Sequence, residues 1–426
     1  MIHWPGRGRW GLPSPDMSAG IGYDRPTMRV LFASTLCLFD PASGAMRSCR
    51  DMLAALARAG HEIRSVTTTC LDRPVTPSVN VFLAGIGASL PDPRRLPRLE
   101  ADGGIHVLVP VATMLRPTMM AREEERYFNR VVRQMEERRP DVILGVGPGA
   151  ADRALWRAAA ARGIPVVLYV SNLSVRSPDM TRDAALVITD SAFTADHCRR
   201  VLGVEARAVG KFMQPVSVPA GARPSYCLVI NPEPQKGGRL ALDIMWRVSQ
   251  VAPDIRFAVV ESRFTVDELL AVSGDRRGPP PNLACLPQHP DLSAAWAGAR
   301  TLLHLSLWPE SGSRVVMEAL SAGIPVLATE IGGVPEMLNG GGLLRPVPME
   351  TGADHLRPAD LSTVTAWADD LVRLQTDAAW YAACSARARA AWRDHPARDR
   401  LDLLELALRD ATAVAVQGRS AADTGP

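Results

Sequence analysis

The segment Leu302–Pro335, LLHLSLWPESGSRVVMEALSAGIPVLATEIGGVP, contains one complete unit of the expected fold. Its apolar run Thr301–Leu307 predicts a buried strand, Gly312–Ala322 predicts a helix, and Pro325–Thr329 predicts a second strand. A strand, a helix and a strand in this order form the βαβ unit from which parallel sheets with helical faces are built.

The same alternation extends in both directions from this segment. Further strands are expected at Met28–Leu36, Glu62–Thr68, Gly104–Pro110, Asp141–Gly147, Pro165–Val170, Leu186–Thr189, Tyr226–Ile230, Arg256–Glu261 and Asn282–Leu286. Helices are expected between them, Ser362–Val414 reads as helical throughout, and the Pro-rich stretch Leu71–Asp102 predicts a long loop. The result is an α/β fold with parallel sheets.

A break at Gly210–Pro224, which holds three prolines, separates two blocks of this alternation. We therefore expect two Rossmann-like domains, residues 28–215 and 216–395, followed by a C-terminal helix and tail over residues 396–426. Residues 1–27 are rich in Gly, Pro, Arg and Trp and predict a disordered extension, so that Met28 is a candidate start. Ligands of such folds bind in the cleft at the carboxyl ends of the strands.

The composition excludes several classes of protein. A net charge of +3, from 48 basic and 45 acidic residues, gives no reason to expect nucleic-acid binding. The seven cysteines are scattered without a Cys-x-x-Cys pair, which favours a reducing, cytoplasmic location. No apolar stretch approaches the roughly 20 residues of a membrane helix. The charged run Arg122–Arg139 predicts a solvated helix face. The alternative is a weak association with the inner membrane surface, through this run or through Arg94, Arg95 and Arg98.

The chemistry concentrates after the strand Thr301–Leu307. Glu310 follows the strand, and Ser311, Gly312 and Ser313 open the next helix, whose free N–H groups suit a phosphate. Glu318, in the same helix, can accept two hydrogen bonds from a ribose diol. The residues alone leave a second interpretation open, in which Ser311 is only a helix N-cap and Glu318 a solvated position.

This segment resembles the signature of retaining GT-B glycosyltransferases of family 4 (glycosyl transferases group 1). The family pattern is Glu, seven residues, Glu, a small-Ala-Gly-x-Pro-Val strand and Gly-Gly-x-Pro-Glu, and all of it is present in order from Glu310 to Glu336. The resemblance covers about Met28 to Arg393 and is specific in the second half. It implies two Rossmann-like domains with parallel sheets facing across a cleft, C-terminal helices bracing both, and transfer of a sugar from a nucleotide-sugar donor with retention of configuration.

The resemblance also implies roles for single residues. Glu310 would contact the donor sugar, Glu318 the ribose, and the amides around Ser311–Arg314 the distal phosphate. The family usually has Phe-Gly or Gly-Phe where this chain has Gly312-Ser313. Lys236 matches the family lysine that binds the donor diphosphate, a role that suits a compact ammonium charge. The other interpretation of Lys236 is a surface lysine at a helix start.

Three further positions belong to the expected donor site. Gly44 is the candidate in the loop after the first strand. Many relatives have a histidine where this chain reads Ser171-Asn172, so that these two residues either hydrogen-bond the sugar or form an Asx-type turn. The family arginine near a strand end is replaced by Ile230 and Asn231, and Arg314 is a candidate to compensate for it.

The absence of certain motifs completes the expectations. No Asp-x-Asp occurs, and the eight histidines lack ligand spacing, so we expect a metal-independent enzyme with no cofactor besides its nucleotide-sugar substrate. His289 and His304 are expected to be structural. The acceptor is an unknown carbohydrate, lipid-linked or small molecule. The alternative is a catalytically degenerate GT-B protein that acts as a donor-binding or scaffold subunit.

Overall fold

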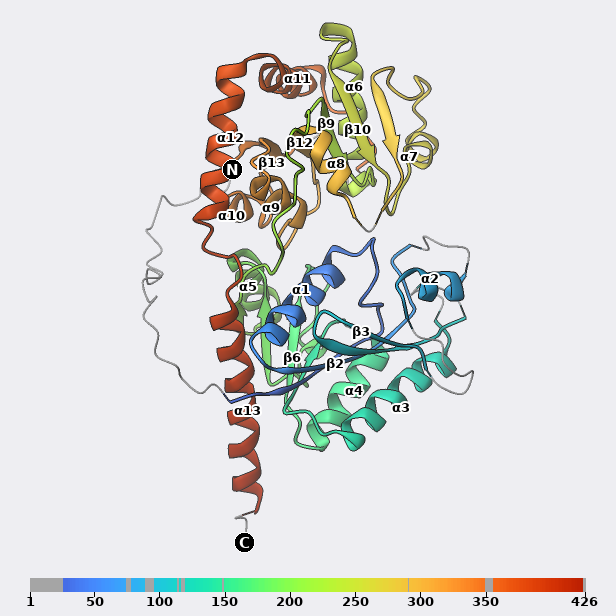
Figure 1. Ribbon diagram of the computed structural model, residues 1–426, viewed down its shortest axis with the longest axis vertical. Coiled ribbons are helices and arrows are strands. Elements are labelled where there is room, and N and C mark those ends of the chain that lie inside the picture. Colours follow the sequence, from blue (N-terminus) through green and yellow to red (C-terminus); the bar gives the residue numbers. More distant parts are fainter. Residues whose placement is uncertain are drawn as a thin grey trace.

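Two sheets, one from each half of the chain, are stacked one above the other (Figure 1). The structure is a computed structural model that describes residues 26–73, 78–88, 96–112, 115, 119–147, 149–289, 291–348 and 355–423. The predicted disordered extension falls, except for its last two residues, outside these ranges, as do Arg94 and Arg95. The proposed domain boundaries stay predictions.

The first sheet has eight strands in the order β3-β4-β2-β1-β5-β6-β7-β8, all parallel except for the antiparallel pair β3–β4. Its strands are β1 (Arg29–Ser34), β2 (Glu62–Thr68), β3 (Arg98–Ala101), β4 (Gly104–Val109), β5 (Val142–Gly145), β6 (Val166–Val170), β7 (Leu186–Thr189) and β8 (Ala206–Ala208). Its helices are α1 (Gly44–Arg58), α2 (Val79–Gly85), α3 (Ala121–Glu137), α4 (Ala150–Ala161) and α5 (Ala192–His197), with a π-helical turn at Cys198–Leu202. We call this unit the first domain.

The second sheet has six parallel strands in the order β11-β10-β9-β12-β13-β14. Its strands are β9 (Tyr226–Ile230), β10 (Arg256–Val260), β11 (Leu283–Leu286), β12 (Ala299–His304), β13 (Val326–Thr329) and β14 (Leu343–Arg345). Its helices are α6 (Gly238–Val251), α7 (Val266–Ser273), α8 (Ser293–Gly298), α9 (Arg314–Ser321), α10 (Val334–Leu338), α11 (Leu361–Thr376) and α12 (Ala378–Arg393). We call this unit the second domain. The predicted architecture of two parallel-sheet α/β domains is confirmed.

Several details differ from the sequence prediction, and the short strands β8 and β14 were not expected. The expected loop Leu71–Asp102 contains α2 and the antiparallel edge strand β3. The C-terminal region is broken between α12 and the last helix, α13 (Leu401–Asp423), where Pro396 cannot continue a helix. Helix α9 begins at Arg314, two residues later than predicted.

The last helix, α13, returns to the first domain. Its residues Leu404, Ala407, Leu408 and Ala411 are buried in the first-domain core, whereas α11 and α12 pack on the second domain. Helices α12 and α13 therefore run along one edge of the molecule and span both domains (Figure 1).

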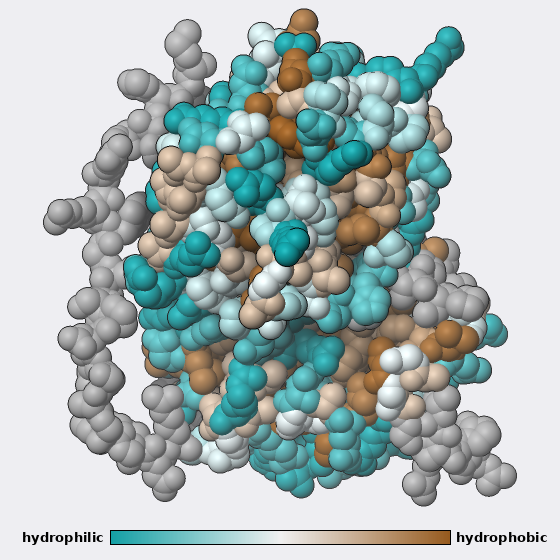
Figure 2. Space-filling view, turned by 45° about the horizontal axis from the view of Figure 1, so that its top comes forward, coloured by the Kyte–Doolittle hydropathy of each residue, from teal (hydrophilic) through white to brown (hydrophobic). Residues whose placement is uncertain are grey.

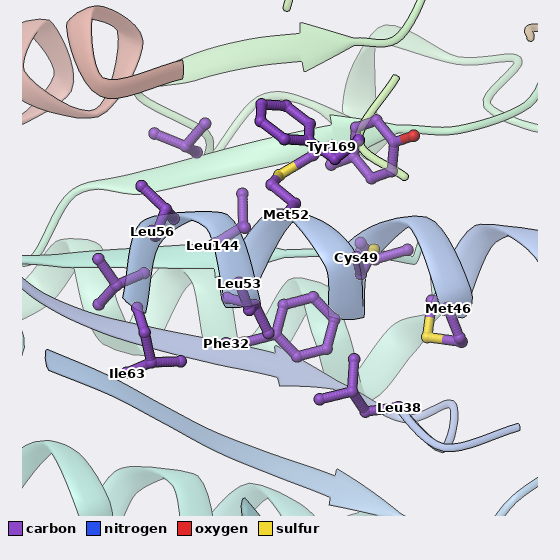
Figure 3. Packing of buried hydrophobic residues seen from close by; sticks show 14 of the residues in the cluster. Phe32, Leu38, Met46, Cys49, Met52, Leu53, Leu56, Ile63, Leu144 and Tyr169 are labelled. Carbon is purple, nitrogen blue, oxygen red and sulfur yellow. The ribbon is translucent and has the colours of Figure 1, made fainter. Parts of the chain in front are cut away.

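Helix α1 is held on the first sheet by a buried hydrophobic cluster (Figure 3). Met52 and Leu53 of α1 lie in this cluster with Phe32 of β1, Ile63 of β2 and Tyr169 of β6. Each such side chain contributes about 1.5–3 kcal/mol when it is fully buried. This packing fixes the helix start, which lies at the carboxyl end of β1 and faces the second domain.

On the face shown in Figure 2, hydrophilic and hydrophobic residues are interspersed. The predicted solvated face of α3 is observed, with Arg122, Glu125, Arg126, Arg133 and Glu136 exposed. Within the described residues, no helix has both the length and the apolarity needed to span a membrane.

Candidate active site

A cleft of about 450 Å³ lies between the two domains. Its walls come from segments that follow the carboxyl ends of β1, β5 and β6 in the first domain and of β9, β10, β11 and β12 in the second. All the predicted site residues lie in these walls: Gly44, Ser171, Asn172, Lys236, Glu310, Ser311, Gly312, Ser313, Arg314 and Glu318. The structure thus brings together residues that are up to 274 positions apart in the chain.

Glu310 is the centre of a three-residue charge cluster in the second domain. Its Oε1 lies 2.9 Å from Nζ of Lys236 and 3.3 Å from Nε2 of His304. Burial opposes ionisation of Glu310, but the charges of Lys236 and His304 outweigh it, so that its pKa lies well below the usual range. A carboxylate at this position is therefore ionised at neutral pH. His304, expected to be structural, is a direct partner of the predicted catalytic residue.

The loop that carries Glu310 rests on the Gly-Gly turn. The amide of Gly333 donates to the carbonyl of Glu310 at 2.7 Å. A Cβ on Gly332 would lie 2.6 Å from backbone atoms of Glu310, and one on Gly333 would lie 2.0 Å from the carbonyl oxygen of Ser311. Side chains at these two positions would collide with the loop, so the two glycines set the position of the Glu310 backbone.

The residues between Glu310 and α9 form a loop that reaches the first domain. The hydroxyl of Ser311 donates to the carbonyl of Ser171, across the domain boundary. The N-cap of α9 is Ser313, whose side chain caps nothing and whose hydroxyl is buried without a protein partner. The interpretation of Ser311 as an N-cap is therefore wrong, because the helix begins later and the Ser311 hydroxyl is used between the domains.

Glu318 is buried rather than solvated, with only 3% of its surface exposed. Its Oε1 accepts from Nε of Arg314 at 2.9 Å and lies 3.7 Å from an Nη of Arg47 in the first domain. Its Oε2 is buried without any protein partner. The solvated alternative for Glu318 is thus wrong, and one carboxylate oxygen is left for a ligand that donates hydrogen bonds.

Arg314 is tied to three protein acceptors. Besides Glu318, it contacts Asp51 of α1 at 2.6 Å and the carbonyl of Phe212 at 3.2 Å. Burial lowers its pKa, but the charges of Glu318 and Asp51 raise it further, so that the guanidinium stays charged. Its contacts place it as the link between Glu318 and the first domain, and leave it little freedom to replace the missing family arginine.

At the end of β6, Asn172 forms the Asx-type turn that was one of its two interpretations. Its Oδ1 accepts from the amide of Ser174 at 2.9 Å. Ser171 uses its carbonyl to accept from Ser311. Both residues also line the cleft, so the turn presents them to the space between the domains.

Several polar atoms in the cleft wall are buried and have no partner in the protein. They are Oδ1 of Asn231, Oε1 of Gln288, Oγ of Ser313 and Oε2 of Glu318. A buried polar atom without a partner costs about 1–3 kcal/mol. Such a group of atoms in one cleft indicates a site that a polar ligand completes.

Other contacts around the site were not predicted. Arg47 of α1 and Lys211 of the linker line the cleft, and Lys211 pairs with Asp190 of the first domain. Asp51 of α1 contacts Arg314, and the carboxylate of Glu336 in α10 accepts from the amides of Ala192 at 2.9 Å and Phe193 at 3.1 Å. No local spacing in the sequence reveals these contacts.

Comparison with protein families assigns the chain to a class. Residues 43–209 match the glycosyl transferase 4-like domain, and residues 226–377 match the glycosyl transferases group 1 domain. With two facing parallel sheets and a polar cleft between them, the chain is a glycosyltransferase of GT-B architecture. The glycosyl transferase 4-like match lies in its first half and the glycosyl transferases group 1 match in its second half, and together these matches span more than half of its length.

Solved structures share this fold at low sequence identity. A glycosyltransferase from Rickettsia africae ESF-5 aligns with a TM-score of 0.57 at 14% identity, over 93% of this chain and 99% of that one. HepE from Anabaena, in complex with UDP-glucose, gives 0.59 at 16% identity, over 92% and 100%. The pneumococcal O-GlcNAc transferase GtfA, in complex with UDP and GlcNAc, gives 0.60 at 10% identity, over 90% and 99%. None of the curated proteins matches the sequence.

Proposed function

We propose that this glycosyltransferase moves a sugar from a nucleoside diphosphate donor to an acceptor with retention of anomeric configuration. The observation that carries the proposal is the charge cluster of Glu310, Lys236 and His304, which lies in the cleft next to the loop that opens α9. A cation and free amides suit a diphosphate, and an ionised carboxylate suits the hydroxyl groups of a sugar.

In this proposal each residue has a separate task. Lys236 and the amides of Ser311–Arg314 bind the diphosphate and stabilise the charge that develops on it as it leaves. Glu310 orients the donor sugar, and the free oxygen of Glu318 accepts from the ribose. In a front-face reaction the leaving phosphate takes the proton of the acceptor, so that the protein contributes mainly positioning and electrostatics.

The contacts across the cleft support a site that excludes water. Ser311 to Ser171, Arg314 to Asp51 and Glu336 to the start of α5 all join the two domains. Exclusion of water protects a glycosyl donor from hydrolysis. Because HepE and GtfA were solved with uridine nucleotides, UDP-sugars are the first donors to test.

Metal independence, the absence of a cofactor and a cytoplasmic location remain part of the proposal. The acceptor is a carbohydrate, a lipid-linked sugar or a small molecule, and a weak contact with the membrane surface belongs to the lipid-linked case. The degenerate alternative predicts nucleotide binding without turnover.

The test is to incubate the protein with a panel of nucleotide-sugars and candidate acceptors and to measure release of the nucleoside diphosphate, with its binding measured by calorimetry. Lys236→Met is expected to lower kcat/KM by about 100-fold or more. Arg256→Met is the matched control. Arg256 is an exposed cation at the amino end of β10, whereas the cleft lies at the carboxyl end of this strand. Absence of binding to every nucleoside diphosphate would refute the proposal, and binding with no turnover for any acceptor would favour the degenerate alternative.

A further inference from the structure

A buried ion pair, Asp190 with Lys211, lies where the two domains meet and has no role in the function proposed above. Asp190 is fully buried and Lys211 is only 4% exposed. The Oδ2 atom of Asp190 accepts from Nζ of Lys211 and, at 3.2 Å, from the hydroxyl of Tyr169. Lys211 and Tyr169 both line the cleft.

The carboxylate of Asp190 lies directly against the donor loop of the second domain. The Ser311 hydroxyl, which donates to Ser171, is also 3.4 Å from Oδ2 of Asp190. A Cβ on Gly312 would lie 3.1 Å from the Asp190 carboxylate. The position of Ser311 and Gly312 therefore depends on where this carboxylate is held.

Lys211 also lies at the point where the chain passes between the domains. Its amide donates to the carbonyl of Ala397 at 2.7 Å, and its carbonyl accepts from the amide of Asp399 at 3.2 Å. A Cβ on the neighbouring Gly210 would lie 2.3 Å from the Ala397 carbonyl oxygen. The linker after β8 and the segment between α12 and α13 are thus joined at Lys211. We call this junction the hinge, and it fixes the backbone that carries the Lys211 ammonium.

The use of lysine in this chain points to the same residue. Of 48 basic residues only two are lysines, Lys211 and Lys236, and both line the cleft. Arginine supplies every other basic side chain, although it differs from lysine in carrying a planar, five-donor group. A compact ammonium is thus used only at the cleft, once beside Glu310 and once beside Asp190.

We propose that the Asp190–Lys211 ion pair is a positioning element of the donor site, which holds the Ser311–Gly312 loop in its phosphate-binding position when the domains are docked. The inference rests on the proposed function. Supporting contacts of this kind fix the residues that touch a ligand to within a fraction of an ångström. The pair connects three parts of the molecule, namely the hinge, the end of β7 and the donor loop.

A double variant separates positioning from stability. A single substitution leaves one buried charge unpaired and destabilises the fold, whereas replacement of both partners by neutral residues of similar size is tolerated. Asp190→Asn/Lys211→Met is therefore expected to melt within about 4 °C of the wild type. Its kcat/KM for the donor should nevertheless fall by about 10- to 100-fold, mostly through a higher donor KM and a higher Kd for the nucleoside diphosphate.

The matched control is His61→Gln/Glu405→Gln. This pair is also buried, with 3.3 Å between Nε2 of His61 and Oε1 of Glu405, but it joins α13 to the first domain away from the donor loop. The control is expected to keep the donor KM of the wild type. Wild-type donor KM and nucleotide Kd in a folded Asp190→Asn/Lys211→Met protein would overturn the inference.

Lys211→Arg provides a second test if the double variant does not fold. It keeps the charge but forces a larger planar group beside Tyr169 and Ser311, so it should weaken nucleotide binding while Lys236 is intact. Unchanged binding of UDP, GDP and ADP by Lys211→Arg would overturn the inference. Failure of the wild-type protein to bind any of these nucleotides would instead refute the proposed function.

Discussion

Glu310→Gln is expected to change nucleotide binding and turnover in opposite directions. Lys236 Nζ lies 2.9 Å from Glu310 Oε1. A diphosphate has to draw this ammonium away from the carboxylate, and it also meets the negative charge of Glu310. Replacement by Gln removes both costs, so that a nucleoside diphosphate without a sugar should bind more tightly. Turnover should fall, because the carboxylate that orients the sugar is gone.

The magnitude follows from the geometry of the pair. At an effective dielectric constant of about 20, lengthening this contact from 2.9 Å to about 4 Å costs about 1.6 kcal/mol. Such a cost corresponds to roughly a tenfold change in affinity. Calorimetric titration of wild type and variant with UDP measures it, alongside the rate of sugar transfer.

Glu318→Gln is the matched control, since Glu318 is a second buried carboxylate of the same cleft but contacts Arg314 rather than Lys236. Its substitution removes a charged acceptor of the ribose and should weaken the binding of UDP. Equal or weaker UDP binding by a folded Glu310→Gln protein would refute the assignment of Lys236, the ion-pair partner of Glu310, as the ligand of the diphosphate.

Three further predictions concern stability, domain motion and the loop. Burial raises the pKa of Asp40 from an ordinary 3.8 to about 7, so its contribution to the free energy of unfolding is fully present below about pH 4 and is lost as the pH rises to about 7. Asp40→Asn should therefore remove up to about 4 kcal/mol of pH dependence between these values, measured by urea unfolding, and an unchanged slope would contradict the burial argument. Arg73→Ala removes two 2.9 Å contacts to Glu268 and a 2.6 Å hydrogen bond to the carbonyl of Arg263, which join the first domain to the second. Because both side chains are partly exposed, stability should change by less than about 1 kcal/mol, while X-ray scattering should show a larger radius of gyration; an identical radius would argue against a role in closure. Gly333→Ala should lower the melting temperature and abolish nucleotide binding, because the added Cβ would lie 2.0 Å from a backbone oxygen. Gly44→Ala is the control and should fold normally, because nothing lies within 4 Å of its added Cβ. Equal melting temperatures for the two variants would refute the steric reasoning.

Most interior strands could be predicted from the sequence. Strands β2, β7 and β9 match the expected ranges to the residue, whereas β1 and β5 lie within expected ranges that are longer at both ends. Strands β7 and β9 are short apolar runs, as is typical of parallel strands that are buried on both faces. The edge strands β3, β8 and β14 have only three or four residues and are largely unburied, so they give little apolar signal. Their position depends on tertiary pairing, which a local pattern does not contain.

The candidate site shows the same division. Lys236, Glu310 and Glu318 could be found because they follow strand ends or share a helix with a recognisable motif. Lys211 could not, since its partner Asp190 is a neighbour only in the folded chain. The contact of His304 with Glu310 could not be predicted either, because the sequence does not show that the end of β12 lies close to Glu310.

Helix α13 has a consequence for biosynthesis. The first domain is synthesised before the second, but Leu404, Leu408 and Ala411, which belong to its core, follow the whole second domain in the sequence. Domains usually fold in the order of their synthesis. Here the earlier domain leaves part of its apolar core uncovered until α13 has been synthesised, after the second domain. The first domain can therefore complete its core only after the second domain has been made.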